Sequence, residues 1–259
     1  MSRRAAPRLR SILGRAGRAA LRRILRHRPL LAFDYDGTLA PLVTDPAAAL
    51  LPRATHVRLR ALAQRLPCIV VSGRQRAQVA RFLRRVPLRA VVGNHGGEAG
   101  QPAPGTRALM RRWHRLLTAL LSRHPGAWLE DKRLSLTLHV RPPASLARLR
   151  RSLAALAPAR DGLRVLPGKR VLNLVPATAP DKGLALAAAM ARLGCLHAVF
   201  IGDDHTDEDA FRRLGAPAVV TVRVGRVRHS RARWRLLRQA DMDRLLDLLL
   251  ALAPAAGSG

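Results

Sequence analysis

The sequence is short of cysteine, aromatic residues and acids, and it has no long apolar run. Two of its 259 residues are Cys and 3% are aromatic. Cys68 and Cys195 show no CxxC or clustered Cys/His spacing, so neither a disulfide framework nor a zinc site is expected. The longest apolar run near the C-terminus, residues 248–253, is too short to cross a bilayer. We therefore expect a globular chain without a transmembrane segment.

The N-terminal region lacks the features of a secretory signal. Residues 1–28 contain ten Arg, no acid and no apolar core, so we expect a cytoplasmic protein. Within residues 11–27 the apolar positions recur at helical spacing, which predicts an amphipathic helix in this basic extension. Its arginine-rich face would suit anionic lipid, but packing on the edge of a domain is the more ordinary role.

Acids are few, and the charge balance is extreme. Lys and Arg number 47 against 16 acids, a net charge of +31. One interpretation is a nucleic-acid or membrane partner. The arginines, however, are spread along the whole chain, and few aromatic residues are available to stack on bases. We therefore expect no nucleic-acid partner, although the positive field should attract small anionic substrates.

The scarcity of acids makes their one dense cluster informative. Five of the sixteen fall within seven residues, at 203, 204, 207, 208 and 209. Carboxylates crowded together in this way indicate a cation site or a catalytic task rather than solvation.

Short apolar runs alternate with helical patterns along much of the chain. Predicted strands at 30–33, 68–71, 88–92 and 198–201 each lead into polar or glycine residues. This alternation predicts an α/β fold with a doubly wound parallel sheet. Ligands of such sheets bind beyond the carboxyl ends of the strands, where these polar residues fall.

The alternation of strand and helix patterns stops at the Pro- and Gly-rich residues 101–105 and resumes after residues 176–180. Between them lie two predicted strand pairs, each preceded by a helix. This pattern predicts a discontinuous core of residues 29–103 and 178–254, with an inserted α+β cap at 104–177. We expect a monomer.

Two carboxylates directly follow the first buried strand. One of Asp34 and Asp36 can attack phosphorus while the other exchanges a proton with the leaving oxygen. Two anions would repel a phosphate ester, so a cation is required, and Mg²⁺ suits carboxylate oxygens. Asp203, at the end of another strand, can supply a third oxygen.

Ser72 ends a second predicted strand, and Lys182 begins a predicted helix. A hydroxyl and an ammonium are suitable donors to the oxygens of a transferring phosphoryl group. Taken alone, Ser72 would be an ordinary helix cap and Lys182 an ordinary surface lysine. Their significance depends on the motifs around them.

Together, these motifs resemble those of a known family. Residues 34–38, 72–74, 182 and 202–207 are similar to the four ordered motifs of haloacid-dehalogenase-like phosphatases. More narrowly, segments 93–96, 130–135, 168–172 and 181–183 resemble trehalose-6-phosphate phosphatases, and the resemblance extends from residue 30 to about 211. It implies a Rossmann-like core with a sugar-recognising cap. It also implies hydrolysis of trehalose 6-phosphate to trehalose and phosphate through an aspartyl-phosphate intermediate.

The resemblance assigns roles in the core. Asp34 would be the nucleophile and Asp36 the general acid and base, while Ser72 and Lys182 would hold the phosphoryl oxygens. Mg²⁺ would lie on Asp34, the backbone carbonyl of Asp36, and Asp203. An outer carboxylate would orient these ligands. That carboxylate would be Asp207.

In the cap, the resemblance assigns Glu130 and Lys132 to the sugar hydroxyls. Their i, i+2 spacing on a strand places both side chains on one face. His139 lies on the same face of its predicted strand as Arg141, and for His139 a structural role is equally expected. The other predicted contacts to the sugar phosphate are Arg74, Asn94, Arg141, Lys169 and Asn173.

One departure from the family pattern concerns the sugar. Asn173 and Val175 stand where the family usually carries Glu and a basic residue, and Asn bonds a hydroxyl without the assistance of charge. Another sugar phosphate, such as sucrose phosphate, is therefore the nearest alternative substrate. A catalytically silent sugar-phosphate sensor and a nucleic-acid binder are more distant alternatives, and the intact motif residues disfavour the sensor.

Overall fold

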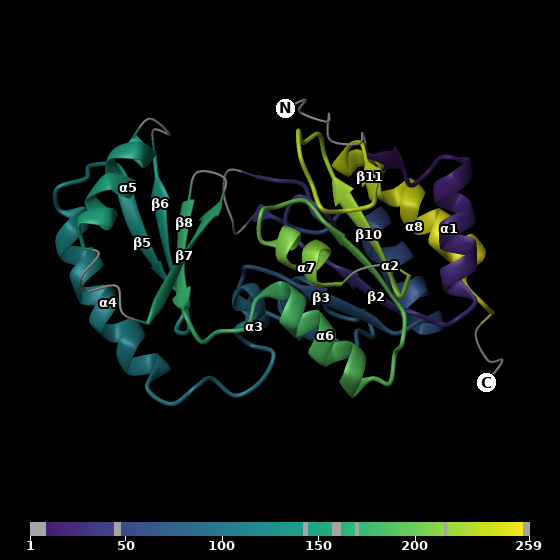
Figure 1. The fold of residues 1–259 in the computed structure, drawn as a ribbon, viewed down its shortest axis with the longest axis horizontal. Coiled ribbons are helices and arrows are strands. Elements are labelled where there is room, and N and C mark those ends of the chain that lie inside the picture. The colour runs from purple at the N-terminus through teal and green to yellow at the C-terminus, as the bar shows by residue number, and fades with distance from the viewer. Residues whose placement is uncertain are drawn as a thin grey trace, which may run out of the picture.

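The chain forms two β-sheets that lie side by side (Figure 1). The computed structural model describes residues 9–43, 48–141, 145–156, 162–168, 171–214 and 217–255. A seven-stranded sheet has the order β1-β11-β10-β9-β2-β3-β4, and a four-stranded sheet has the order β5-β6-β8-β7. The pairings of the first are parallel and those of the second antiparallel. The predicted fold class is confirmed.

The strands of the parallel sheet are short, and those at its centre are buried on both faces. They are β1 (Arg10–Ser11), β2 (Leu30–Phe33), β3 (Cys68–Val71), β4 (Ala90–Val92), β9 (Ala198–Gly202), β10 (Val219–Val224) and β11 (Trp234–Leu236). Continuous apolar runs are typical of strands that are covered on both sides. In β2, Leu31 and Phe33 enter one core cluster, and Leu30 and Ala32 enter the other. Alternate side chains therefore hold a layer of helices on each face.

Two helical layers cover this sheet. Side chains of α1 (Arg15–Leu25), α2 (Arg53–Arg65), α3 (Arg76–Phe82) and α8 (Met242–Leu252) pack into the first cluster. Those of α6 (Lys182–Arg192) and α7 (Asp207–Arg213) pack into the second. This is the doubly wound arrangement, which leaves the carboxyl ends of the strands open to a ligand.

The predicted N-terminal helix begins later than its apolar pattern indicated. β1 precedes it and pairs with β11, and the helix proper starts at Arg15. Leu21, Ile24 and Leu25 are buried, and α1 contacts α8. The helix thus packs on the edge of the core. Across the described ranges, no helix is both long and apolar enough for a bilayer span.

The antiparallel sheet is covered by helices on one face only. It comprises β5 (Ala127–Asp131), β6 (Leu136–Val140), β7 (Leu163–Gly168) and β8 (Val171–Pro176), with α4 (Thr106–Leu121) and α5 (Ser145–Ala155) beside it. Leu136 and Leu138 pack with Trp113 of α4 in a separate apolar cluster. The intervening Thr137 and His139 line a cavity on the opposite face. We call residues 104–177 the cap. These boundaries are the ones predicted from the sequence, and they stay a prediction.

Candidate active site

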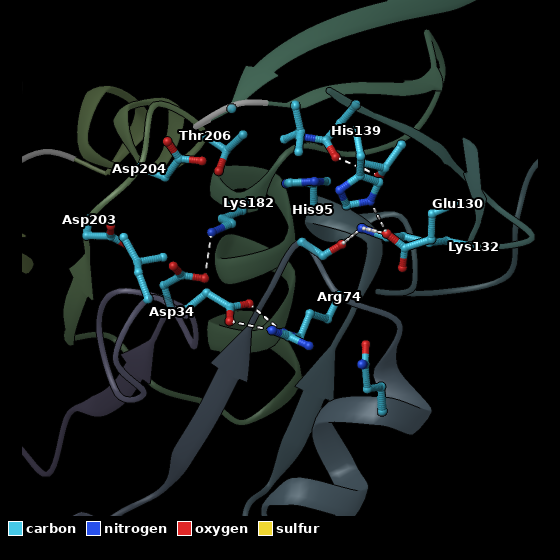
Figure 2. A pocket seen from close by; sticks show the side chains of 18 residues that line it. Asp34, Arg74, His95, Glu130, Lys132, His139, Lys182, Asp203, Asp204 and Thr206 are labelled. Carbon is cyan, nitrogen blue, oxygen red and sulfur yellow. Dashed lines mark hydrogen bonds and ion pairs between the residues drawn. The ribbon is translucent and has the colours of Figure 1, made fainter. Parts of the chain in front are cut away.

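A cavity of about 190 Å³ lies between the carboxyl ends of the core strands and the polar face of the cap sheet (Figure 2). Both parts contribute its walls. The core supplies Asp34, Asp36, Leu42, Gly73, Arg74, Gln78, His95, Lys182, Asp203, Asp204 and Thr206. The cap supplies Glu130, Lys132, Thr137, His139, Gly168, Val171 and Asn173. The cavity therefore brings together predicted residues that are far apart in the sequence.

Lys182 connects two buried carboxylates at the floor of the cavity. Its Nζ donates to Asp34 Oδ1 and to Asp207 Oδ1, each at 2.8 Å. Lys182 begins α6, whose end is fixed by the Leu184 N–H donating to the side chain of Asp181 at 2.7 Å. Burial alone would lower the pKa of Lys182, but the Asp207 and Asp34 carboxylates outweigh it and raise the pKa. The side chain is therefore a fixed ammonium.

A third buried carboxylate, that of Asp203, joins the two that bind this ammonium. Single oxygens of Asp34, Asp203 and Asp207 lie within 4.8 Å of one another. Burial raises the pKa of Asp34 well above its usual range, the charges of Asp207 and Asp203 act in the same direction, and Lys182 opposes them. Lys182 balances only part of this negative charge, so the donor set fits a divalent cation.

Gly37 makes the approach of Asp203 possible. Its φ of +78° is in the left-handed region, and a Cβ there would lie 2.3 Å from Asp203 Oδ2. Its N–H donates to Ala40 O at 2.8 Å, which closes the turn after β2. A side chain at this position would push Asp203 away from Asp34.

Arg74 binds the carboxylate of Asp36 with two hydrogen bonds. Its Nε donates to Asp36 Oδ2 at 2.6 Å, and its Nη2 donates to Asp36 Oδ1 at 2.7 Å. This forked geometry is a strong way for Arg to bind a carboxylate. The guanidinium also lies 5.8 Å from the ring centroid of Tyr35 and 5.5 Å from that of Phe82. Arg74, predicted to contact the sugar phosphate, here holds Asp36 in place.

The other predicted residues differ in their distance from the cavity. Ser72 is fully buried behind the lining, where its Oγ accepts the Arg74 N–H at 3.1 Å. Asp207 is likewise fully buried. Arg141 is exposed and lies 5.5 Å from the Trp128 ring centroid, and it is not among the lining residues. Lys169 lies outside the described residues.

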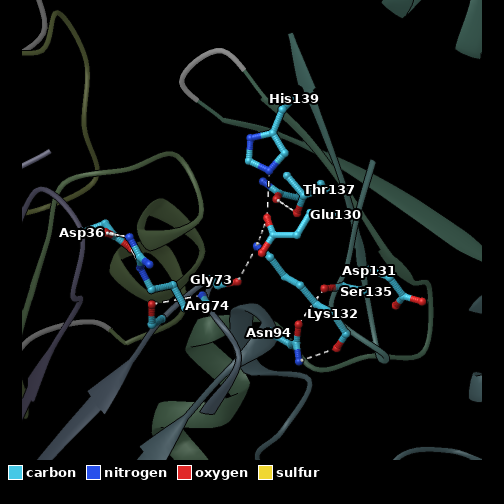
Figure 3. Close-up of polar contacts among 12 residues, drawn as sticks. Asp36, Gly73, Arg74, Asn94, Glu130, Asp131, Lys132, Ser135, Thr137 and His139 are labelled. Atoms are coloured by element: carbon cyan, nitrogen blue, oxygen red, sulfur yellow. Dashed lines mark hydrogen bonds and ion pairs between the residues drawn. The ribbon is translucent and has the colours of Figure 1, made fainter. Parts of the chain in front are cut away.

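Polar side chains of the cap form a row across three strands. In register, Glu130 of β5 opposes Thr137 of β6, which opposes Asn173 of β8. Thr137 Oγ1 donates to Asn173 Oδ1 at 2.8 Å, and Glu130 Oε2 lies 2.8 Å from His139 Nε2 (Figure 3). The His139 ring stacks on Trp128 with 4.8 Å between centroids. The row presents fixed hydrogen-bonding groups to the cavity.

The neighbours of Glu130 in this row favour its ionised form. Burial by itself would raise the pKa of Glu130, but the hydrogen bond with His139 and the charge of Lys132 together lower it. Lys132 Nζ lies 3.7 Å from Glu130 Oε2. Glu130 is thus held as a carboxylate, the form that accepts hydrogen bonds from hydroxyl groups.

Asn94 and Lys132 also join the cap to the core. Ser135 Oγ donates to Asn94 Oδ1 at 2.6 Å, and Lys132 Nζ donates to Gly73 O at 3.2 Å (Figure 3). Asn94 Nδ2 donates more weakly to Lys132 O at 3.5 Å. We call these three contacts the cap–core bridge. Asn94, predicted to contact substrate, is here buried and serves the bridge.

Several lining residues were absent from the predicted set, among them His95, Thr137 and Thr206. Thr137 could have been found from strand register, since it opposes Glu130. His95 lies in a turn with unusual backbone geometry, because Asn94 and His95 have φ values of 52° and 57°. Each such residue costs about 1–3 kcal/mol and persists only where the surroundings enforce it. That strain is invisible in the sequence.

Comparisons with known proteins identify a family that matches most of the chain. The family model for trehalose-phosphatase matches residues 32–239. The trehalose-phosphate phosphatases of Mycobacterium ulcerans (strain Agy99) and Mycobacterium tuberculosis (strain H37Rv) are 33% and 34% identical over 247 residues. Each alignment covers 88% of this chain and 59% of the relative.

The fold is shared with a solved structure. The C-terminal domain of the C. albicans trehalose-6-phosphate phosphatase matches with a TM-score of 0.78 at 21% identity, covering 95% of this chain and 99% of that one. At that identity the likeness concerns the fold. The family model, however, covers most of the chain, from the strand before Asp34 to beyond β11. The chain therefore belongs to the trehalose-phosphatase family.

Proposed function

We propose that the chain hydrolyses trehalose 6-phosphate to trehalose and phosphate, with Mg²⁺ as its cofactor. The observation that carries the proposal is the position of Asp34, which shares Lys182 with Asp207 at one side of a cavity whose other side is the polar row of the cap. The names of the mycobacterial relatives support the choice of sugar. The chain spans 59% of their length, so the activity of the whole relatives is carried over here as a proposal.

In the first step, an Asp34 oxygen attacks phosphorus and the bond from phosphorus to the sugar oxygen breaks. Lys182 donates to the phosphoryl oxygens and offsets their charge. Asp36 gives its proton to the departing sugar oxygen. Because Arg74 bonds both Asp36 oxygens in the present structure, it has to release one of them for this transfer. The phosphate of the substrate is an alternative partner for Arg74.

In the second step, water hydrolyses the aspartyl phosphate. Asp36, now a carboxylate, takes a proton from the water, whose oxygen attacks phosphorus and displaces the Asp34 oxygen. Phosphate leaves and Asp34 is restored. Ser72 positions this region by accepting the Arg74 N–H.

The residues that would hold Mg²⁺ are Asp34, Asp203 and the backbone carbonyl of Asp36, with Asp207 orienting them through Lys182 and the Asp204 N–H. The close set of buried carboxylates supports this assignment. When bound, the ion neutralises negative charge on the phosphoryl group.

Sugar selection is assigned to the cap. Glu130, Lys132 and Asn173 face the cavity and can pair with hydroxyls. A site built from such groups rejects ligands that lack their partners, because its own polar groups are then left unpaired. Asn173 is neutral and already accepts from Thr137, so its amide N–H groups are its remaining contribution.

A phosphate-release panel tests the proposal. Trehalose 6-phosphate, sucrose 6-phosphate, glucose 6-phosphate and p-nitrophenyl phosphate are compared with Mg²⁺ and with EDTA. We expect the highest kcat/KM with trehalose 6-phosphate and loss of turnover in EDTA that Mg²⁺ restores. Preference for a different sugar phosphate would overturn the substrate, and full turnover in EDTA would overturn the cofactor.

A further inference from the structure

His95 presents a polar group with no partner at the wall of the cavity. Its ring is 8% exposed, and neither ring nitrogen makes a hydrogen bond to any residue in the described ranges. Figure 2 shows the ring between Lys182 and the side chains of the cap. Buried polar groups in proteins are nearly always hydrogen-bonded. Both ring nitrogens are therefore available to a molecule seated in the cavity.

The backbone is built to hold the ring at this point. His95 N–H donates to Ser72 O at 2.9 Å, and Asn94 N–H donates to Arg74 O at 2.8 Å. These bonds keep both residues in the left-handed region, where only a few per cent of non-glycine residues lie. A Cβ on Gly73 would lie 2.4 Å from His95 Cε1. Such backbone strain clusters at ligand sites, where it is part of the mechanism.

The surroundings keep the ring neutral. Burial lowers the pKa of His95 well below its usual range, and the charges of Lys132 and Lys182 lower it further. The Asn173 side chain lies close enough to act as a hydrogen-bonding group and opposes this shift, although no bond to either ring nitrogen has normal hydrogen-bond geometry. A neutral imidazole has one N–H donor and one acceptor nitrogen.

This combination selects a particular kind of partner. A sugar hydroxyl both donates and accepts, so it can satisfy either ring nitrogen, whereas a phosphate dianion offers acceptors alone. We propose that His95 is a specificity-determining residue that hydrogen-bonds a hydroxyl of the substrate sugar close to the phosphoryl site. The assignment rests on the proposed function and adds to it a sugar contact from the core.

A matched pair of variants tests this role. His95→Gln keeps a donor and a strong acceptor, and His95→Met has nearly the same length with no donor and only a weakly accepting sulfur. Both place an unbranched side chain at the same strained position. kcat/KM is measured with trehalose 6-phosphate and with p-nitrophenyl phosphate, which carries no sugar hydroxyl, and melting temperatures are recorded.

With trehalose 6-phosphate, we expect His95→Met to lower kcat/KM by about 10- to 100-fold, mainly through KM, which is the range for a buried partner left unpaired. His95→Gln should recover most of the loss. With p-nitrophenyl phosphate, both variants should stay within about twofold of wild type. An equal loss on both substrates, or no loss on either, would overturn the inference.

The failure of the proposed function would give a different result. If the wild type prefers another sugar phosphate and the Met and Gln variants separate on that substrate, the role of His95 stands and the trehalose assignment falls. If the wild type prefers p-nitrophenyl phosphate over every sugar phosphate, both are overturned. Should both variants fail to fold, the ¹⁵N shifts of the His95 ring in wild type are followed on adding trehalose. An unchanged ring would overturn the contact.

Discussion

The surroundings of Asp34 act on its ionisation in opposite directions. A nucleophile has to be ionised, yet burial and two neighbouring carboxylates raise its pKa. Lys182 offsets this by donating directly to one of its oxygens. A bound divalent cation would lower the pKa of Asp34 further towards the ionised form.

The variant Asp34→Asn separates chemistry from folding. The amide has the same shape but is no nucleophile, so phosphate release should fall by at least about 1,000-fold. Because the folded state disfavours the Asp34 charge, its removal should leave the melting temperature at or above that of wild type. Asp243→Asn, in the first turn of α8 and outside the cavity lining, is the control with normal turnover. Retained turnover in Asp34→Asn would assign the nucleophile elsewhere.

The residues predicted best from the sequence are those whose position follows from strand order alone. Asp34 directly follows β2, and Asp203 directly follows β9. These two strands are hydrogen-bonded neighbours in the sheet. Their convergence could therefore be predicted once the sheet was inferred. The orientation of Ser72 and the partnerless ring of His95 depend on loop backbone that no periodicity encodes. They emerge only in three dimensions.

At the scale of elements, the cap–core bridge determines how the cavity is closed. The hairpin between β5 and β6 reaches the core through Ser135 and Lys132. Its partners in the core are Gly73, which lies between Ser72 and Arg74, and Asn94, which directly precedes His95. Cap position is thereby coupled to the turn that carries His95.

Ser135→Ala should loosen this closure. It leaves the buried Asn94 Oδ1 without its donor, a loss of about 1–3 kcal/mol from the closed state. We expect KM for the sugar phosphate to rise with little change in kcat, and amide exchange at residues 131–135 to accelerate. Ser122→Ala, at the exposed residue directly after α4, removes a local bond to Ala119 O and should alter neither. Unchanged exchange in Ser135→Ala would mean that the cap is held by other contacts.

Element prediction from the sequence succeeded where periodicity was strong. Strands β2 and β3 were predicted at their observed residues, 30–33 and 68–71. β1 and β11 were not foreseen, because strands of two or three residues are too short to show a pattern. Nor was helix α7, whose first turn consists of the acids Asp207, Glu208 and Asp209. Acids at a helix N-terminus also interact favourably with its dipole, so part of that cluster has a second physical reason.

At the scale of the molecule, the net charge of +31 remains the most unusual property. Many arginines lie away from the cavity lining, on exposed helix faces such as that of α1. A surface of one sign creates a long-range potential that concentrates ions of the opposite sign. A sugar phosphate dianion would be drawn towards the molecule before it meets Lys182 or Arg74.

Salt should therefore act on capture rather than on chemistry. The Debye length falls from about 30 Å at 0.01 M to about 10 Å at 0.1 M ionic strength, which screens the distant arginines and spares the buried Lys182. Between these concentrations we expect kcat/KM for the sugar phosphate to fall several-fold while kcat stays constant. Melting temperatures over the same range exclude a loss of fold. A fall in kcat at constant KM would instead place the salt effect inside the cavity, and the surface charge would then need a reason other than the substrate.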